Sequence, residues 1–444
     1  MEMEKNMTKK IKITATGDSM LLRKFPVDYD HVEIKNIIEK GNIKLTNLEM
    51  VLTEGNVFAS TFCGGEWISS DLVNFDELMK YGFNMYACSN NHSMDYSYGG
   101  LIETYNYLSK KRVAFAGIGK SLIEATKPTY YTYINELNQK VSVAMISLTT
   151  TFIDAARAGD ENDFFQARPG INTVRNNSIY YVNQDEMAIL KQIAKKTEIN
   201  GERDNARKNG TLPPEEPGTF NFGGIFFKLS EQQGKLTECN KFDLQRIIDS
   251  IKEAKKCADY VIVMAHSHQI KHSDYTEPDY FFEELCRKCI DEGACCVIGS
   301  GTHQLKPIEI YQGKPIFYSL GNFIFESHHV EKLPIDFWDK YNFDRLLKID
   351  EMENILSKNG TVGLEFDEIN YLSYIPYMEY ENDKLSKLYL YPIELTFNGD
   401  LIHKGLPVRA SQANINRIYT QLVNISQDYG TKLCLKDKFI EIII

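Results

Sequence analysis

The chain has 444 residues, 43% of them hydrophobic, with 50 lysines and arginines against 61 aspartates and glutamates. This length can bury one large domain with additions, or two domains. The formal net charge of −11 argues against a broad electrostatic surface for nucleic acid or anionic membrane, although a local basic pocket for a small anionic substrate is compatible with it.

The first 150 residues alternate predicted strands with predicted helices. Apolar alternation predicts strands at 10–22, 43–50, 84–95, 114–119 and 140–151, the third running into a polar loop. Apolar positions at helical spacing predict helices at 31–42, 74–83 and 99–113. A strand and helix repeat of 30 to 40 residues is typical of βαβ units and a mostly parallel sheet.

Residues 155–230 interrupt this alternation and are predicted to be an insertion. The stretch 201–224 is rich in glycine, proline and charge, which predicts a long loop or insertion. The loop 200–226 is expected to be either a lid over the site or a disordered insertion. The alternation resumes with helices at 244–258 and 279–293 and strands at 259–268 and 294–303, and residues 306–326 are predicted to pair antiparallel. The tail contains a predicted strand at 387–398 and a predicted helix at 410–426.

The sequence has the pattern of neither a signal peptide, a membrane-spanning helix nor a disulfide framework. Residues 1–20 carry positive charge without a following apolar segment, so they do not resemble a signal peptide, and no apolar run reaches 18 residues. We therefore expect a soluble, cytoplasmic chain without a membrane anchor, and an extracytoplasmic one if an export segment has been removed. The nine cysteines are odd in number and loosely spaced, unlike a disulfide framework.

One pair of cysteines, Cys286 and Cys289, has the CxxC spacing of a zinc site. It lies within a set of apolar positions at the spacing of one helix face, namely Phe282, Leu285, Cys286, Cys289 and Ile290. This pattern predicts that the thiols face a core. A zinc site would require both to turn toward Cys295 and Cys296.

Polar side chains follow five predicted strands at the point where each strand ends. They are Asp18; Asn47 and Glu49; Asn90, Asn91, His92 and Asp95; His266 and His268; and Ser300 and His303. Because the ends of parallel strands meet at one edge of a sheet, we expect these side chains to converge. Carboxylate, imidazole and amide donors suit Zn, Mn or Fe, so the sequence predicts a site for one or two divalent ions, the second requiring a bridging carboxylate.

Other polar residues have narrower or weaker interpretations. His92 and Asp95, three residues apart, can form a hydrogen-bonded pair that protonates a leaving group. Arg23 and Arg168 are candidates for binding a substrate carboxylate or phosphate, with surface salt bridges as the alternative. His272 is expected to be exposed. Neither GxGxxG after the first strand nor a Walker A motif occurs, which excludes a Rossmann interpretation.

Several segments resemble the CapA family, the poly-γ-glutamate capsule biosynthesis proteins whose domain is similar to calcineurin-like metallophosphoesterases. They are TGDSMLLR, TNLEM, SNNHSMDYSYGGLIETYNYL, FAGIG, VIVMAHSHQ and IGSGTHQLKPIEIYQGKPIFYSLGNFIFE. The resemblance implies a four-layer α/β/β/α sandwich of the metallophosphoesterase type over residues 11–330, with the insertion at about 155–230. Residues 331–444 would form a C-terminal extension packing on the same domain.

The resemblance also implies site roles, motif by motif. Asp18 matches the first metal-binding acid of the family, and Glu49 matches the bridging carboxylate. His92 matches the catalytic histidine, and the other metal ligands are matched by Asn91, His266 and His303. Two departures stand out. Met20 occupies the histidine position of the Asp-x-His motif, and GSGTH lacks one expected histidine, which His268 could replace.

The implied function is a metal-dependent hydrolase or transferase associated with poly-γ-glutamate capsule biosynthesis. Its substrate would be small and anionic or γ-glutamyl, with cleavage at a phosphoester or a γ-glutamyl or peptide-like bond, and capsule-synthesis proteins would be its partners. The alternative is a non-catalytic binding or assembly protein for the polymer that keeps the fold with an incomplete metal site. Met20 and the missing histidine favour the alternative, whereas the Asn91–His92 pair and His266 oppose it.

Overall fold

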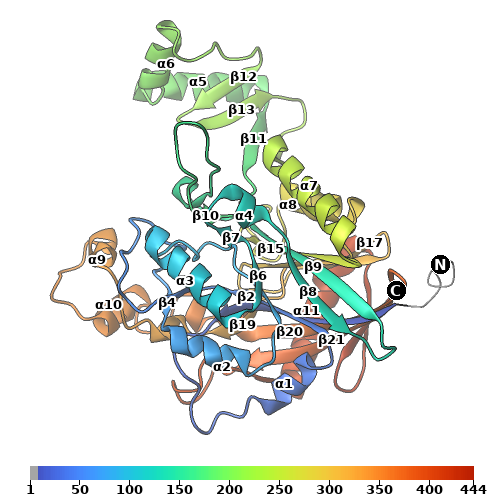
Figure 1. Ribbon diagram of the computed structural model, residues 1–444. Coiled ribbons are helices and arrows are strands. Elements are labelled where there is room, and N and C mark those ends of the chain that lie inside the picture. The colour runs from blue at the N-terminus through green and yellow to red at the C-terminus, as the bar shows by residue number, and fades with distance from the viewer. Residues whose placement is uncertain (1–8) are drawn as a thin grey trace.

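Two mixed β-sheets face each other at the centre of the protein, described here from a computed structural model that covers residues 9–444 (Figure 1). Residues 1–8, part of the stretch predicted not to be a signal peptide, lie outside the described residues. The first sheet has the order β23-β24-β21-β20-β1-β2-β5-β6, with β19 on β1 and β22 on β21. Its strands are β1 (Lys10–Met20), β2 (Ile43–Leu48), β5 (Met85–Ala87), β6 (Ala114–Ala116), β19 (Asn322–Phe325), β20 (Leu372–Glu381), β21 (Lys384–Leu395), β22 (Pro407–Arg409), β23 (Lys432–Leu435) and β24 (Ile440–Ile443).

The second sheet has the order β17-β18-β16-β15-β9-β8. Its strands are β8 (Thr129–Ile134), β9 (Lys140–Thr149), β15 (Tyr260–Ser267), β16 (Cys296–Gly301), β17 (Ile308–Tyr311) and β18 (Lys314–Phe317). The four inner strands are parallel, and β8 and β17 pair antiparallel at the two edges. The parallel strands β1, β2, β5 and β6 of the first sheet and β9, β15 and β16 of the second are those that the sequence predicts.

Helices cover the outer face of each sheet and give four layers. Alternate residues of β15 separate the layers, because Ile262 and Met264 enter the core between the sheets while Val261 and Val263 pack under the helices. The first sheet is covered by α1 (Val32–Ile38), α2 (Phe75–Met79) and α3 (Ser97–Lys111), and the second by α7 (Lys241–Cys257) and α8 (Tyr280–Asp291). The fold is therefore the predicted four-layer α/β/β/α sandwich.

The carboxyl-terminal third of the chain completes the first sheet. β20 pairs antiparallel with β1 from Lys10–Glu381 to Thr14–Tyr377, and α11 (Gln412–Ser426) packs into the core between the sheets. The sequence predicted neither β20, which has Pro376 at its centre and is buried along almost its whole length, nor its place beside β1. The expectation of antiparallel pairing holds for β17 and β18 but is wrong for β19, which runs parallel to β1.

The inserted segment forms a small subdomain that projects from the sandwich (Figure 1). It contains a sheet of order β12-β13-β11-β14, made of β11 (Asn176–Val182), β12 (Thr219–Phe222), β13 (Ile225–Leu229) and β14 (Gly234–Cys239). α5 (Gln184–Thr197) and α6 (Gly201–Lys208) accompany it. The prediction of a loop over 201–224 holds for residues 209–218 but is wrong for its two ends, which form α6 and β12. Ion pairs of Arg207 with Asp204 and Glu215 support α6 and the turn after it.

The shorter elements lie mainly around the ends of the central strands. They are β3 (Val51–Leu52), β4 (Ser69–Ser70), β7 (Ile118–Gly119), β10 (Gly170–Ile171), α4 (Leu122–Thr126), α9 (Ile335–Tyr341) and α10 (Ile349–Leu356). Trp67 packs with Phe337 of α9 and Met352 of α10, which ties the carboxyl-terminal helices to the loop before β4. From residue 9 onward, no helix has both the length and the apolar character needed to cross a membrane.

The cysteines of the CxxC spacing face a core, as predicted. Cys286 and Cys289 pack in the layer between α8 and the second sheet, whereas Cys295 and Cys296 lie in the core between the two sheets. The two pairs are on opposite sides of that sheet, and within residues 9–444 no metal-ligand cluster contains a cysteine. The two pairs therefore cannot bind one zinc ion together.

A buried ion pair anchors the inserted subdomain to the sandwich. Arg175, just before β11, donates from Nε to Asp243 of α7 at 2.7 Å, and Arg246 donates to the same carboxylate at 2.8 Å. Burial alone would raise the pKa of Asp243, but the hydrogen bonds from Arg175 and Arg246 outweigh it and lower the pKa to about 2. Asp243 is 1% exposed, so it depends on these partners to stay charged.

We predict that Arg175→Gln lowers the free energy of unfolding by about 1.5–3 kcal/mol at pH 7, because it leaves a buried carboxylate with one partner fewer. The contribution of a carboxylate with a lowered pKa is complete above its ordinary pKa and is lost as the pH falls toward its folded value. The difference between variant and parent in urea denaturation should therefore be full at pH 6 and shrink as the pH falls from about 4 toward about 2. A difference independent of pH would contradict this account.

Candidate metal centre

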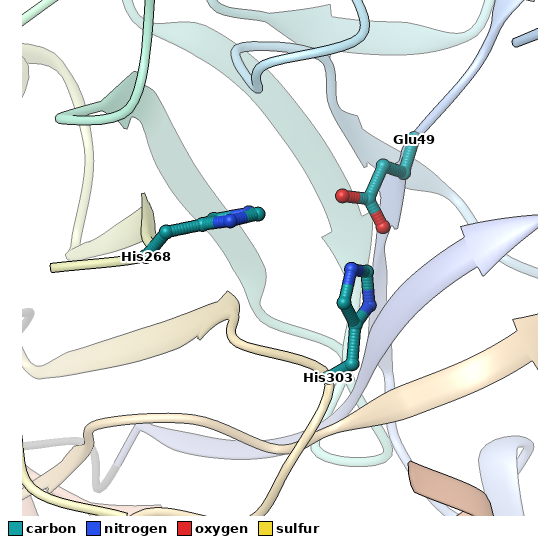
Figure 2. A group of neighbouring side chains, drawn as sticks. All are labelled: Glu49, His268 and His303. Atoms are coloured by element: carbon teal, nitrogen blue, oxygen red, sulfur yellow. The ribbon is translucent and has the colours of Figure 1, made fainter. Parts of the chain in front are cut away.

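The ends of the central strands bring two groups of metal-ligand side chains together. Asp18, Glu49 and His266 form one group, and Glu49, His268 and His303 form the other, with the ligand atoms of each group within 4.8 Å of one another. Figure 2 shows the Glu49 carboxylate and the rings of His268 and His303 pointing toward a common space. Glu49 belongs to both groups, the position that a bridging carboxylate would have.

Parallel strand register explains this convergence. Asp18 of β1 lies beside Asn47 of β2, and His266 of β15 lies beside Ser300 of β16. The two sheets meet at this edge, where the Gly301 backbone N–H donates to Asp18 Oδ2 at 3.0 Å. Side chains from both sheets therefore share one site, although their strands belong to different layers.

His266 lies at the centre of the cluster. Its Nδ1 is 3.0 Å from Ser300 Oγ, and its Nε2 is 2.6 Å from Asn91 Oδ1, 3.0 Å from His268 Nε2 and 3.5 Å from Glu49 Oε1. Two ligand nitrogens at about 2.1 Å from one ion and about 90° apart would themselves be about 3 Å apart. The spacing of the two Nε2 atoms thus matches neighbouring ligands of a single ion.

The Glu49 carboxylate is the strongest sign of a bound cation. It is 0% exposed, and neither of its oxygens has a hydrogen-bond partner among the described residues. Burial and, after it, the nearby carboxylates Asp18 and Asp95 raise its pKa well above the usual range. A carboxylate buried in this way is costly unless it is paired with a positive charge. The donor set therefore fits a divalent ion.

The environment of the neighbouring side chains favours the protonation states that bind metals, namely neutral imidazole and ionised carboxylate. Burial lowers the pKa of both His268 and His303, which favours the neutral imidazole that binds metals. The Nδ1–H of His303 can donate to Asn322 Oδ1 at 2.8 Å, which leaves Nε2 for the cluster. Burial would raise the pKa of Asp18, but the hydrogen bond and charge of His266 outweigh it and hold the pKa below its usual range.

His92 is oriented by a buried carboxylate. Its Nδ1 is 2.7 Å from Asp95 Oδ2, and Asp95 also accepts the backbone N–H groups of Gly64 and Ile68. Burial raises the pKa of the Asp95 carboxyl above its ordinary value. Because Nδ1–H donates to Asp95, Nε2 is directed away from it, and His92 lines the cavity above the metal cluster. The pair has the geometry that proton transfer requires.

This cavity has a volume of about 420 Å³ and is roofed by the carboxyl-terminal extension. Its floor includes His92, His268 and His303, and its walls include Met20 of β1 and Glu66. The roof is formed by Tyr341, Glu353, Leu356 and the segment 362–365. Burial, reinforced by neighbouring carboxylates, raises the pKa of Glu66 to about 7 and that of Glu353 to about 7.

The structure brings the predicted metal-site residues together but gives the two predicted arginines other partners. Arg23 Nε donates to the buried Glu326 at 2.9 Å, and Arg168 is exposed and donates to the Arg157 carbonyl. Neither arginine lines the cavity, so the prediction that they bind substrate is not supported. No residue of the segment 200–226 lines the cavity either, so the prediction of a lid is not supported. The side chain of His272 is 69% exposed, as expected.

Sequence reasoning missed the acidic residues around the cavity. Glu66 follows the glycine pair 64–65, which was a detectable turn signal, although nothing placed that turn near the strand ends. Glu353 and Glu365 lie in the extension, far from any motif, and only the packing of α9 and α10 brings them to the cavity.

The fold and the site together define a four-layer α/β/β/α sandwich with a cluster of candidate metal ligands at its strand ends. The family model described as bacterial capsule synthesis protein PGA_cap matches residues 12–327. The chain belongs to this capsule synthesis family.

The chain is also similar to individual proteins of known sequence or structure. The chain is 28% identical over 417 residues to the protein y4sH of Sinorhizobium fredii, covering 91% of this chain and 87% of y4sH. It is 26% identical over 295 residues to the PGA biosynthesis protein CapA of Bacillus subtilis, covering 66% of this chain and 52% of that protein. Among solved structures, a phosphatase from Mycoplasma pneumoniae aligns with 94% of this chain and 100% of its own at 11% identity and a TM-score of 0.40.

We predict that His268→Ala weakens binding of Mn²⁺ or Zn²⁺ at least 10- to 100-fold, the loss typical when only a group supporting a ligand is removed. His272→Ala is the matched control, because it removes an exposed histidine from the same loop and should leave the affinity unchanged. Isothermal titration of chelator-treated protein measures both. Equal affinities for the two variants would remove His268 from the ligand set.

Glu49→Gln should abolish tight metal binding and, in chelator-treated protein, raise stability. A carboxyl whose pKa is raised by folding destabilises the folded state increasingly as the pH rises above its ordinary value of 4.5. The variant should therefore be more stable than the metal-free parent by about 1–3 kcal/mol at pH 8 and indistinguishable from it near pH 4. Urea denaturation at the two pH values checks the sign, and a less stable variant at pH 8 would contradict it.

Proposed function

We propose that this protein is a metal-dependent hydrolase of the capsule synthesis family, acting on a phosphoester or a γ-glutamyl or peptide-like bond. The observation that carries the proposal is the buried Glu49 carboxylate, whose unpartnered oxygens are shared by two ligand groups. One or two Mn, Zn or Fe ions suit these donors. When bound, such ions polarise a phosphoryl or carbonyl oxygen and activate water as the nucleophile.

The chain's own residues would do the rest. Asn91 Oδ1, which lies 2.6 Å from His266 Nε2, would help to bind the ions, while its Nδ2 is held by the Gly64 carbonyl at 2.7 Å. Asp95 fixes the His92 ring by the 2.7 Å hydrogen bond, so that Nε2 can deliver a proton to the leaving group. The extension roofs the cavity and would limit the access of water to a bound substrate.

The family relationship supports a substrate from capsule polymer metabolism, since two relatives are described as PGA and capsule biosynthesis proteins. We propose a small anionic or γ-glutamyl compound as substrate, and capsule-synthesis proteins as partners. The ligand residues Asp18, Glu49, His266, His268 and His303 mark where the scissile phosphoryl or carbonyl group of this substrate would lie. The carboxyl groups of Glu66 in the cavity wall and Glu353 in its roof would face the remainder of the substrate.

The second candidate is a non-catalytic binding or assembly protein for the polymer, and Met20 favours it. Met20 lines the cavity where a histidine ligand was expected, and a thioether is a poor ligand for a hard ion. Gly301 adds to this, because GSGTH offers one histidine where two were expected. Metal content separates the candidates: less than about 0.2 transition-metal ions per chain after loading with Mn or Zn would favour this second function.

We predict that the metal-loaded protein turns over at least one substrate class among phosphomonoesters, phosphodiesters and γ-glutamyl amides. His92→Ala should lower kcat by about 10²- to 10⁴-fold on that substrate, because general acid catalysis is lost while the ligands remain. His329→Ala is a control outside the cavity, and it should keep the parent rate. A His92→Ala variant with parent activity would exclude His92 as the acid, and absence of turnover in all three classes would withdraw the hydrolase proposal.

A further inference from the structure

The inserted subdomain contains a second cavity, of about 1000 Å³, that shares no lining residue with the cavity at the metal centre. Asn221 of β12, Phe226 of β13 and Ile179 of β11 lie opposite one another across three strands and form part of its lining. Residues of α6 and of the following loop, including Pro213 and Pro214, form another part. Figure 1 shows α6, β12 and β13 at the far end of the projecting subdomain.

A cationic side chain in this cavity lacks an acidic partner. Arg207 is paired with Asp204 at 3.1 Å and with Glu215 at 2.7 Å. Arg203, one turn earlier on α6, makes no salt bridge within residues 9–444, and its buried Nε–H has no hydrogen-bond partner. The guanidinium group of Arg203 is therefore available for an anionic ligand.

A buried amide supplies a second, independent sign of a ligand. Asn221 is 1% exposed, and its Oδ1 accepts the Gly224 backbone N–H at 2.8 Å. This hydrogen bond distinguishes the amide oxygen of Asn221 from its nitrogen. The buried Nδ2 donor has no hydrogen-bond partner among the described residues. Buried donors are rarely left unsatisfied, so the lining of this cavity lacks one hydrogen-bond acceptor.

Apart from the two arginines, Glu215, Glu216 and Lys228, the lining of this cavity is apolar or uncharged. Phe226 is 52% exposed and Ile225 is 49% exposed, although both are large and hydrophobic. With Ile179 and the two prolines they offer an apolar surface next to Arg203. An inorganic anion would leave this surface uncovered, whereas a ligand with an apolar portion would bury it.

We propose that this cavity binds an acidic peptide that carries an apolar side chain next to a carboxylate. The carboxylate would pair with Arg203, a backbone carbonyl would accept from Asn221 Nδ2, and the apolar side chain would pack on Phe226 and Ile179. Glu215 is occupied by Arg207, and Lys228 in the lining offsets the exposed carboxylate of Glu216, so a net positive charge remains at the Arg203 position. The site goes beyond the proposed hydrolase, because its binding residues are separate from the metal centre.

The test is isothermal titration of the full-length, chelator-treated protein with the probe peptide acetyl-Glu-Leu-Glu-amide. We expect saturable binding, at least tenfold weaker binding of acetyl-Gln-Leu-Gln-amide, and roughly tenfold weaker binding of acetyl-Glu-Gly-Glu-amide. Because the metal has been removed, the result does not depend on the hydrolase proposal. No binding, or equal affinity for the glutamate and glutamine peptides, would overturn the site.

Variants localise the binding. Arg203→Gln should weaken it at least tenfold, whereas Lys208→Gln, which removes an exposed charge from the same helix outside the cavity, should leave it unchanged. Phe226→Ser alters an exposed side chain, so it should weaken binding without unfolding the subdomain. Equal affinity of the parent and Arg203→Gln would overturn the proposal. Inorganic phosphate that binds as tightly as the peptide would overturn the peptide assignment.

Discussion

The buried carboxylate of Glu49 is the constraint around which the site is arranged. A fully buried carboxylate without hydrogen-bond partners, with Asp18 and Asp95 raising its pKa, is unfavourable in the absence of a cation. Its neighbours offer lone pairs: two imidazoles whose Nε2 atoms are 3.0 Å apart, and an amide oxygen 2.6 Å from one of them. Burying this carboxylate without a positive charge therefore lowers the stability of the folded state. A divalent ion bound at the cluster would restore that stability, so the stability of the fold and metal binding are coupled.

The two sheets and the carboxyl-terminal extension all contribute residues to this cluster and its cavity. Donors come from both sheets, and the hydrogen bond from Gly301 to Asp18 ties their edges together. The extension contributes β20 beside β1 and also the roof over the cavity, so the same segment supports the strand that carries Asp18 and encloses the site. Residues 331–444 are thus integral to the sandwich rather than an addition to its surface.

The inserted subdomain has a different physical character. Its sheet is small, a buried ion pair between Arg175 and Asp243 helps to hold it to the sandwich, and its large cavity has apolar walls and an unpaired arginine. Exposed aromatic and aliphatic side chains are costly in water unless a partner covers them. The chain therefore combines a sandwich that carries a candidate metal centre with a projecting module that exposes apolar side chains.

The sequence by itself determined the alternation of strands and helices and the polar side chains at the strand ends, because hydrophobic periodicity is a property of short stretches. Since the ends of parallel strands meet at one edge of a sheet, these patterns select Asp18, Glu49, Asn91, His92, His266, His268 and His303 as candidate site residues. Only the tertiary structure decided the pairing of β20 with β1, the position of Glu66 and Glu353 around the cavity, and the partners of Arg23 and Arg168. These features depend on contacts between residues distant in sequence, and no local pattern encodes such contacts.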